Sequence, residues 1–117
     1  MRKIETQEMA SSLANYLGYD LFYLSSKTRL LEPRIARQMI MTFMYSKRNL
    51  FRWSLQDVAD VFNRDHATTL NSIKRVNNYR DTEALFRANY ELFESFGNQL
   101  VLTIQHKSLE FMDKHSL

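Results

Sequence analysis

The segment from Ser54 to Tyr79 constrains the fold most, because two amphipathic helical patterns meet there across a very short connection. The apolar residues of the first pattern recur at helical spacing: Leu55, Val58, Val61 and Phe62. The second pattern is assigned in the same way to one helix face: Leu70, Ile73, Val76 and Tyr79. Only residues 63–65 lie between the two. Short helices joined so tightly predict a helix-turn-helix.

Residues that favour a helix start stand before both patterns. Ser54, with Asp57 three residues later, resembles a capping box. Asp65 can accept hydrogen bonds from the free N–H groups of the second helix's first turn. Asn63 tolerates a left-handed backbone, so a turn is feasible there. The second helix is expected to span about residues 66–80.

The start of that second helix is polar and basic. Its exposed end should gather the side chains of Arg64, His66, Thr68 and Asn71. Free N–H groups and the helix dipole favour a phosphate or a base-edge acceptor at such an end. In a DNA-binding helix-turn-helix the second helix enters the major groove. The alternative is an ordinary helical domain in which these polar residues only face water.

Positive charge is concentrated in the middle of the chain, whose total net charge is +3. Residues 25–80 hold eleven Lys or Arg and four Asp or Glu, a net charge of +7, against −1 for residues 1–24 and −3 for residues 81–117. The positive segment contains the predicted helix-turn-helix. Such clustering is expected of a nucleic-acid-binding protein.

The rest of the chain also has helical periodicity, and no segment predicts a strand. Further helices are expected over residues 4–17, 21–24, 33–48 and 82–113, with loops at 25–29 and 49–53. Gly18 should end the first helix, Asp20 should cap the short one, and Pro33 suits a first turn. Thr82 is the expected N-cap of the last segment, which Gly97 is expected to kink or split.

These elements should pack on one core. The 117 residues suffice for a single all-α domain of about six helices that includes the helix-turn-helix. Met39, Met41 and Met44 are interpreted as core residues in preference to a soft metal site. Trp53 is expected to pack against the first turns of the helix after it, in preference to stacking on a base.

Several functions are disfavoured. The chain has no cysteine, and His66, His106 and His115 lack metal-ligand spacing, so no metal is expected. Asp65 and His66 are adjacent and no nucleophile is specified, so we expect no enzyme and no cofactor. No apolar run approaches a membrane span and no signal-peptide core is present, so we expect a cytoplasmic protein that does not contact a membrane.

Three blocks of sequence resemble the C-terminal DNA-binding domain (domain IV) of DnaA, the bacterial chromosomal replication initiator. They are Ser-Lys-Thr-Arg at residues 26–29, Ile-Ala-Arg-Gln-Met-Ile-Met at 35–41, and the stretch from Ser54-Leu55 to Arg64-Asp65-His66. Order and spacing agree over about residues 4–80, which leaves residues 81–117 as a further helical segment. The resemblance implies a Trp-repressor-like fold that binds double-stranded DNA in replication or its regulation.

The resemblance also implies roles for matching residues. Arg29 looks like the basic-loop arginine that enters the minor groove, and Arg37 with Gln38 looks like a phosphate-contacting pair. Asp65 and His66 look like major-groove readers, and Arg64 and Thr68 look like neighbouring base or phosphate contacts. The full predicted DNA-binding set is Lys27, Arg29, Arg34, Arg37, Gln38, Arg64, Asp65, His66, Ala67, Thr68, Asn71, Lys74 and Arg75.

The chain departs from the family at several points. Ala67 stands where the family usually has Thr or Ser, Thr69 where it prefers Val, and the turn has Asn63 in place of a Gly-containing pair. We therefore expect a preferred site that differs from the family's TTAT-and-CACA-type duplex. Gly18 and Gly97 are the only glycines, so no Gly-x-x-x-x-Gly-Lys loop exists and no nucleotide cofactor is expected. The chain is either a free-standing relative or a fragment, and Met1 and the extra helix favour the former.

The C-terminal segment leaves a second function open. Its apolar stripe comprises Leu85, Tyr90, Phe93, Phe96, Leu100 and Ile104, extended by Leu109, Phe111 and Met112. Within it, Phe93, Phe96, Leu100 and Ile104 could serve both the core and a partner. A homodimer through this helix is expected, because a lone helix-turn-helix contacts few bases. The alternative to DNA binding is a protein–protein interaction or adaptor module with the same fold that has lost base reading.

Overall fold

The computed structural model describes the backbone of residues 2–115 and the side chains of residues 4–107, and all its regular structure within that range is helical. The seven helices are α1 (Arg2–Tyr16), α2 (Leu21–Leu24), α3 (Leu31–Ser46), α4 (Arg48–Phe51), α5 (Leu55–Val61), α6 (His66–Thr82) and α7 (Ala84–His115). The all-α class is confirmed, and the one helix beyond the expected six is α4.

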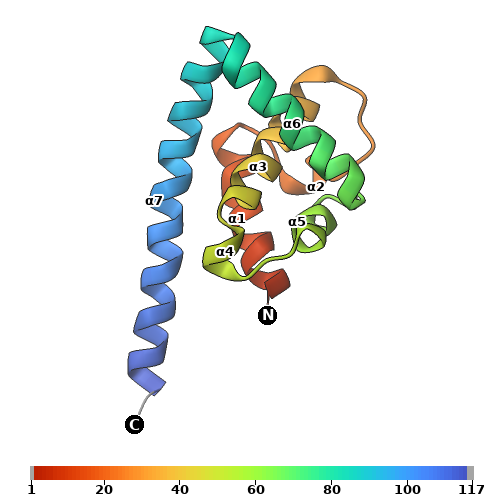
Figure 1. The fold of residues 1–117 in the computed structure, drawn as a ribbon. Coiled ribbons are helices and arrows are strands. Elements are labelled where there is room, and N and C mark those ends of the chain that lie inside the picture. Colours follow the sequence, from red (N-terminus) through yellow and green to blue (C-terminus); the bar gives the residue numbers. More distant parts are fainter. Residues whose placement is uncertain (1, 116–117) are drawn as a thin grey trace.

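Helix α3 is the centre of the core. Ten of its sixteen residues are buried, among them Met39, Met41 and Met44, which line the core as predicted. Helices α1, α5, α6 and α7 pack around it (Figure 1). Phe43 meets the ring of Phe93 from α7 edge-on, with 6.0 Å between the ring centroids. The position of α3 therefore decides where the other helices present their outer faces.

The bounds of α3 and its surroundings differ from the sequence prediction. The helix begins at Leu31, because Pro33 is tolerated in a first turn where N–H groups have no intrahelical partner. It ends at Ser46, and α4 occupies part of the expected 49–53 loop before Arg52 adopts a left-handed backbone with φ of 58°. Trp53 is only 4% exposed and its ring stacks on Phe51, so the base-stacking alternative is wrong.

Two predicted caps also fail. Asp20 stands at the N-cap of α2 but its side chain makes no capping hydrogen bond. Thr82 is the last residue of α6, where its hydroxyl donates to the Asn78 carbonyl oxygen at 2.8 Å, and it does not cap the last helix. The chain turns at Glu83, whose backbone is extended, and α7 begins at Ala84.

Gly97 neither kinks nor splits the last helix, which is continuous from Ala84 to His115. Gly97 lies against the ring of Phe43, and a Cβ added there would lie 2.5 Å from Phe43 Cζ. The missing side chain therefore permits the close packing of α7 on α3. Gly97, which was expected to interrupt the helix, is instead a point of contact between α7 and α3.

The apolar stripe of α7 faces the core. Phe93 is fully buried, Ile104 is 9% exposed, and Phe96 and Leu100 pack partly buried against the same cluster. The described part of the stripe therefore serves the core, the first of the two roles expected of it. Leu85, also assigned to this apolar stripe, is 76% exposed and points away from the core. Leu109, Phe111 and Met112 lie outside the described side chains.

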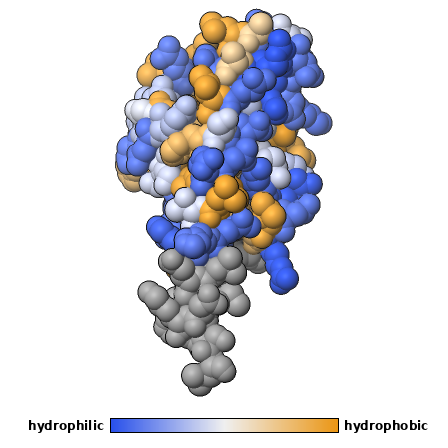
Figure 2. Space-filling model, turned by 90° about the vertical axis from the view of Figure 1, so that its left-hand side faces the viewer, coloured by the Kyte–Doolittle hydropathy of each residue, from blue (hydrophilic) through white to orange (hydrophobic). Residues whose placement is uncertain are grey.

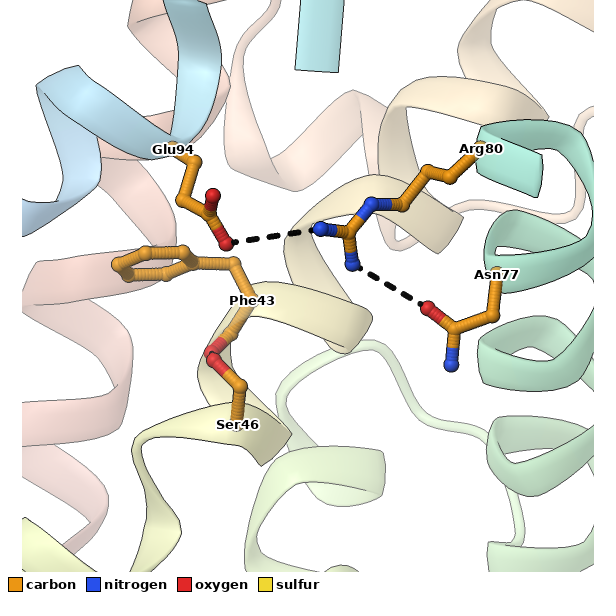
Figure 3. A network of polar contacts seen from close by, with 5 residues as sticks. All are labelled: Phe43, Ser46, Asn77, Arg80 and Glu94. Atoms are coloured by element: carbon orange, nitrogen blue, oxygen red, sulfur yellow. Dashed lines mark hydrogen bonds and ion pairs between the residues drawn. The ribbon is translucent and has the colours of Figure 1, made fainter. Parts of the chain in front are cut away.

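A polar contact joins the end of α6 to α7. Arg80 near the end of α6 reaches Glu94 of α7 at 4.0 Å and Asn77 at 3.3 Å (Figure 3). Its guanidinium also lies 4.3 Å from the ring centre of Tyr90. Helix α7 thus starts at the end of α6 and runs back along the side of the other helices (Figure 1). Among the described residues, no helix combines the length and the apolar character that a membrane span needs.

Candidate nucleic-acid interface

The helix-turn-helix is built by local hydrogen bonds, as the sequence predicts. The Ser54 N–H donates to Asp57 Oδ2 at 2.8 Å, and the Asp57 N–H donates to Ser54 Oγ at 3.0 Å, which completes a capping box for α5. Asn63 has a φ of 55°, the left-handed conformation that the turn requires. Asp65 Oδ1 accepts from the Thr68 N–H at 2.7 Å, so α6 starts at His66 as predicted.

The capping role shapes the chemistry of Asp65. Hydrogen bonds from the Thr68 backbone and hydroxyl hold the pKa of this exposed carboxyl below its usual range, and nearby His66 lowers it further. The group is therefore ionised near neutral pH. Its charge is placed at the exposed start of α6, where it accepts hydrogen bonds from Thr68.

Helix α6 presents an exposed face that contains most of the predicted readers. Thr69, Ser72, Ile73 and Val76 face inward. The exposed side chains are His66, Ala67, Thr68, Leu70, Asn71, Lys74 and Arg75. Leu70 was assigned to the buried face, which is wrong, because it is 36% exposed while Thr69 is completely buried. Sequence reasoning therefore missed Leu70 as a member of the exposed face.

A notch forms where α3 meets α6. Three residues of α3 (Arg34, Arg37, Gln38) and four of α6 (Thr68, Asn71, Ser72, Arg75) line a cavity of about 250 Å³. Two sequence-distant groups of predicted site residues are thus brought together. Arg37 and Gln38 are 7% and 5% exposed, so they form the floor of the notch and are not on the open surface that the sequence suggested.

The notch concentrates positive charge. Burial lowers the pKa of Arg37 to about 10, and repulsion from Arg64 and Arg34 contributes to the shift. The group is still protonated near neutral pH. The Arg37 Nη1 donates to the Leu24 carbonyl oxygen at 3.3 Å, which leaves the remaining N–H groups of its guanidinium for other acceptors. An anion bound in the notch would offset the repulsion of Arg37 by Arg34 and Arg64. Phosphate is well suited to this place, because a guanidinium can donate two parallel hydrogen bonds to its oxygens.

The basic loop lies beside the start of α6. Residues 25–30 connect α2 to α3 without forming a helix (Figure 1). The Lys27 and Arg29 side chains are exposed. Arg64 was predicted to contact a base or a phosphate. In the structure its guanidinium instead donates to the carbonyl oxygens of Phe62 at 2.7 Å and of Ser26 at 2.9 Å. The loop and the turn of the helix-turn-helix are therefore joined directly.

The comparison with family models decides the identity of this arrangement. A model described as the bacterial dnaA protein helix-turn-helix matches residues 6–76, more than half of the chain. The chain belongs to this family. The match confirms the resemblance drawn from residues 4–80, and the DnaA helix-turn-helix is a DNA-binding domain. Comparisons with curated proteins and with solved structures found no match.

The DnaA match covers the basic loop, the notch and the helix-turn-helix but ends before α7 begins. Every predicted DNA-binding residue, from Lys27 to Arg75, lies inside it. The family pattern and the exposed basic face thus coincide in one part of the molecule, and α7 is attached to the opposite side of that part (Figure 1).

Proposed function

We propose that this DnaA-type domain binds double-stranded DNA sequence-specifically, in replication or its regulation, and without ATP hydrolysis. Helix α6 enters the major groove, the basic loop follows the adjacent minor groove, and the notch receives a backbone phosphate. The observation that carries the proposal is the notch, because there a buried arginine of α3 meets the exposed start of α6. A helix start beside three arginines suits DNA better than it suits a neutral protein surface.

Base reading is assigned to the exposed face of α6. Asn71 can pair with an adenine edge, and Lys74 can donate to guanine acceptors. Ala67 and Leu70 offer methyl groups to thymine. Because Ala67 has no hydroxyl, the base pair it faces should differ from the family consensus. Selection from a random duplex pool tests this, and recovery of the unchanged consensus would refute it.

Backbone contacts are assigned to Arg34, Arg37, Gln38 and Arg75 around the notch. Such contacts set the register of a protein on the duplex but carry no sequence information directly. Arg29 and Lys27 on the loop are assigned to the minor groove, whose narrow A·T segments attract arginine. These two sets of side chains would act on neighbouring parts of the duplex.

A titration of labelled duplex DNA by anisotropy, repeated at several salt concentrations, tests the proposal. With about four phosphates contacted, the slope of log affinity against log salt should be near −4. The competing function is an adaptor that retains the fold and has lost base reading. Leu85, Leu92 and Leu102, which are exposed on α7, favour this alternative. No binding to duplex at low salt would remove the DNA proposal and leave the adaptor.

A second copy of the chain would double the DNA site, and we propose that it binds the outward face of α7. Leu85, Leu92 and Leu102 are 76%, 64% and 60% exposed along this helix. The side of the molecule that carries α7 shows hydrophobic patches between hydrophilic side chains (Figure 2). Sedimentation at micromolar concentration should give a dimer that Leu92→Asp abolishes. A 14.0 kDa species at all concentrations would remove the dimer.

A further inference from the structure

Arg64, unlike the exposed Lys27 and Arg29, directs its guanidinium at backbone carbonyl oxygens of the protein. Its Nη1 donates to the Phe62 carbonyl oxygen at 2.7 Å and its Nη2 to the Ser26 carbonyl oxygen at 2.9 Å. A longer contact of 3.4 Å joins Nη1 to the Ser25 carbonyl oxygen. The side chain is partly buried. One guanidinium therefore connects the turn of the helix-turn-helix to the basic loop.

The three carbonyls are well suited to a cation. Phe62 is the C-cap residue of α5, Ser25 is the C-cap residue of α2, and Ser26 follows directly. Carbonyls at a helix C-terminus lack intrahelical donors and carry partial negative charge. The planar arginine fork has five donors pointing in different directions, so one side chain can serve acceptors from two segments at once. A lysine ammonium is a point charge and lacks this geometry.

Few other contacts hold the loop to α5. The Ser25 hydroxyl lies 3.2 Å from the Val61 carbonyl oxygen, but it also lies 3.0 Å from the Leu21 carbonyl oxygen, and its one proton serves one acceptor at a time. The Leu30 N–H donates to Thr28 Oγ1 within the loop itself. Among the described residues, the Arg64–Ser26 hydrogen bond of 2.9 Å is therefore the shortest between the loop and the turn.

We propose that Arg64 is a positioning residue that holds the basic loop at a fixed place beside α6, so that Arg29 and the recognition helix reach adjacent grooves together. This rests on the proposed DNA binding. Without Arg64 the loop is no longer held in place, so it must be ordered when DNA binds. Affinity for DNA then falls because of this ordering cost, although no contact with DNA is removed. Position 64 thus acts through Lys27 and Arg29.

The first test needs no DNA. Trypsin cleaves after lysine and arginine, so Lys27 and Arg29 report directly on how often the loop opens. In the free protein, Arg64→Ala should speed cleavage at these two sites about tenfold, as loss of hydrogen bonds to a charged group predicts. Arg64→Lys should give a smaller acceleration. Lys107→Ala, which removes an exposed cation from α7, should leave the rate unchanged.

The outcome is read from the cleavage sites. Cleavage of Arg64→Ala at Lys27 and Arg29 at the wild-type rate would overturn the proposal. If Arg64→Ala is cut throughout the chain because it no longer folds, Arg64→Lys decides: acceleration confined to the loop supports positioning, and a wild-type pattern overturns it. A thermal melt of each variant identifies which case applies.

The second test is a double-mutant cycle on duplex DNA. Arg64→Ala should weaken binding about tenfold in the wild-type chain and leave it nearly unchanged when Lys27 and Arg29 are both alanine. A direct phosphate contact would give equal losses in both backgrounds and would reduce the salt slope by about one. If the wild-type chain does not bind DNA, the proposed function fails while the trypsin result still stands. Equal losses with normal wild-type binding overturn the positioning role alone.

Discussion

The two sides of the molecule are stabilised in different ways. At the start of α6, polar groups are held by short hydrogen bonds: Asp65 accepts from the Thr68 N–H, and Arg64 donates to the Ser26 carbonyl oxygen. Along α7, shape complementarity dominates, with Gly97 against Phe43 and Tyr16 stacked on Phe96 at 4.5 Å. The first side keeps side chains exposed for a ligand, and the second removes them from water. Substitutions on the two sides should therefore separate binding from stability.

The largest effect is expected at the packed side. Gly97→Val places a branched side chain against the Phe43 ring and should lower the free energy of unfolding by about 3 kcal/mol, the upper range for overpacking a core. Urea unfolding monitored by circular dichroism measures it. The matched control is Asn98→Val, on an exposed position of the same helix. A loss below that of the control would mean that α7 packs loosely on α3.

The next effect belongs to the notch. Arg37→Ala removes a buried cation from between α3 and α6, and affinity for all duplex sequences should fall by roughly 10- to 100-fold, as expected for hydrogen bonds to a charged group. Anisotropy titrations against a selected site and a scrambled site measure both affinities. Lys107→Ala makes the same charge change at an exposed position on α7 and should have little effect. A loss confined to the selected site would contradict the assignment to phosphate.

A smaller and more selective effect is expected on the exposed face of α6. His66→Ala should reduce the preference for the selected site over the scrambled one by about 1–3 kcal/mol, the range for one base contact. Non-specific affinity should change little. Asn78→Ala, exposed farther along the same helix, is the control. Equal losses of specific and non-specific affinity would contradict the role of His66 as a reader.

The smallest expected effect is a loss of stability at acid pH, caused by protonation of Asp65. Hydrogen bonding lowers the pKa of Asp65 in the folded state, so its ionised form contributes stability that is present above the unfolded pKa of about 4 and is lost as pH falls through the folded value. Asp65→Asn keeps a good cap without the titrating group. Its stability should therefore decline less than that of the wild type between pH 5 and pH 3, in melts at matched ionic strength. Parallel declines would show that Asp65 is not involved.

The sequence predicted the helix caps and the turn of the helix-turn-helix correctly, where the hydrogen-bond partners of a residue are its near neighbours in the chain. Ser54, Asp57, Asn63 and Asp65 each take the predicted cap or turn role, because their partners lie within three residues. The start of α6 was therefore correct to the residue. The end of α6 was not, because the chain breaks at Glu83 with neither glycine nor proline to mark the place.

The errors on α6 have a geometric cause. Leu70, Ile73, Val76 and Tyr79 repeat every three residues, and at about 100° per residue such a row drifts by about 180° from its first member to its last. Leu70 and Tyr79 therefore cannot share one face. The alternation of three- and four-residue steps identifies the true inner face: Thr69, Ser72, Ile73 and Val76. Two of these side chains are polar, which concealed the pattern.

Tertiary contacts decided the rest. Nothing near Arg37 in the sequence indicates that α6 would cover it, and nothing near Arg64 indicates that the loop carbonyls, 38 residues away, would accept its donors. Gly97 was taken for a breaker because its contact, Phe43, is 54 residues distant in the chain. The sequence thus identified which residues belong to the basic face, while the packing determined which of them remain exposed.

The burial of α7 also bears on how the domain moves. Its 32 residues make a rod of about 48 Å. Phe93, Gly97 and Ile104 hold this rod in the core, and Arg80 joins it to α6 through Glu94. A tilt of α6 would therefore carry α3 and α7 with it. The helices would dock on a duplex as one rigid body, with little change of shape between the free and the bound state.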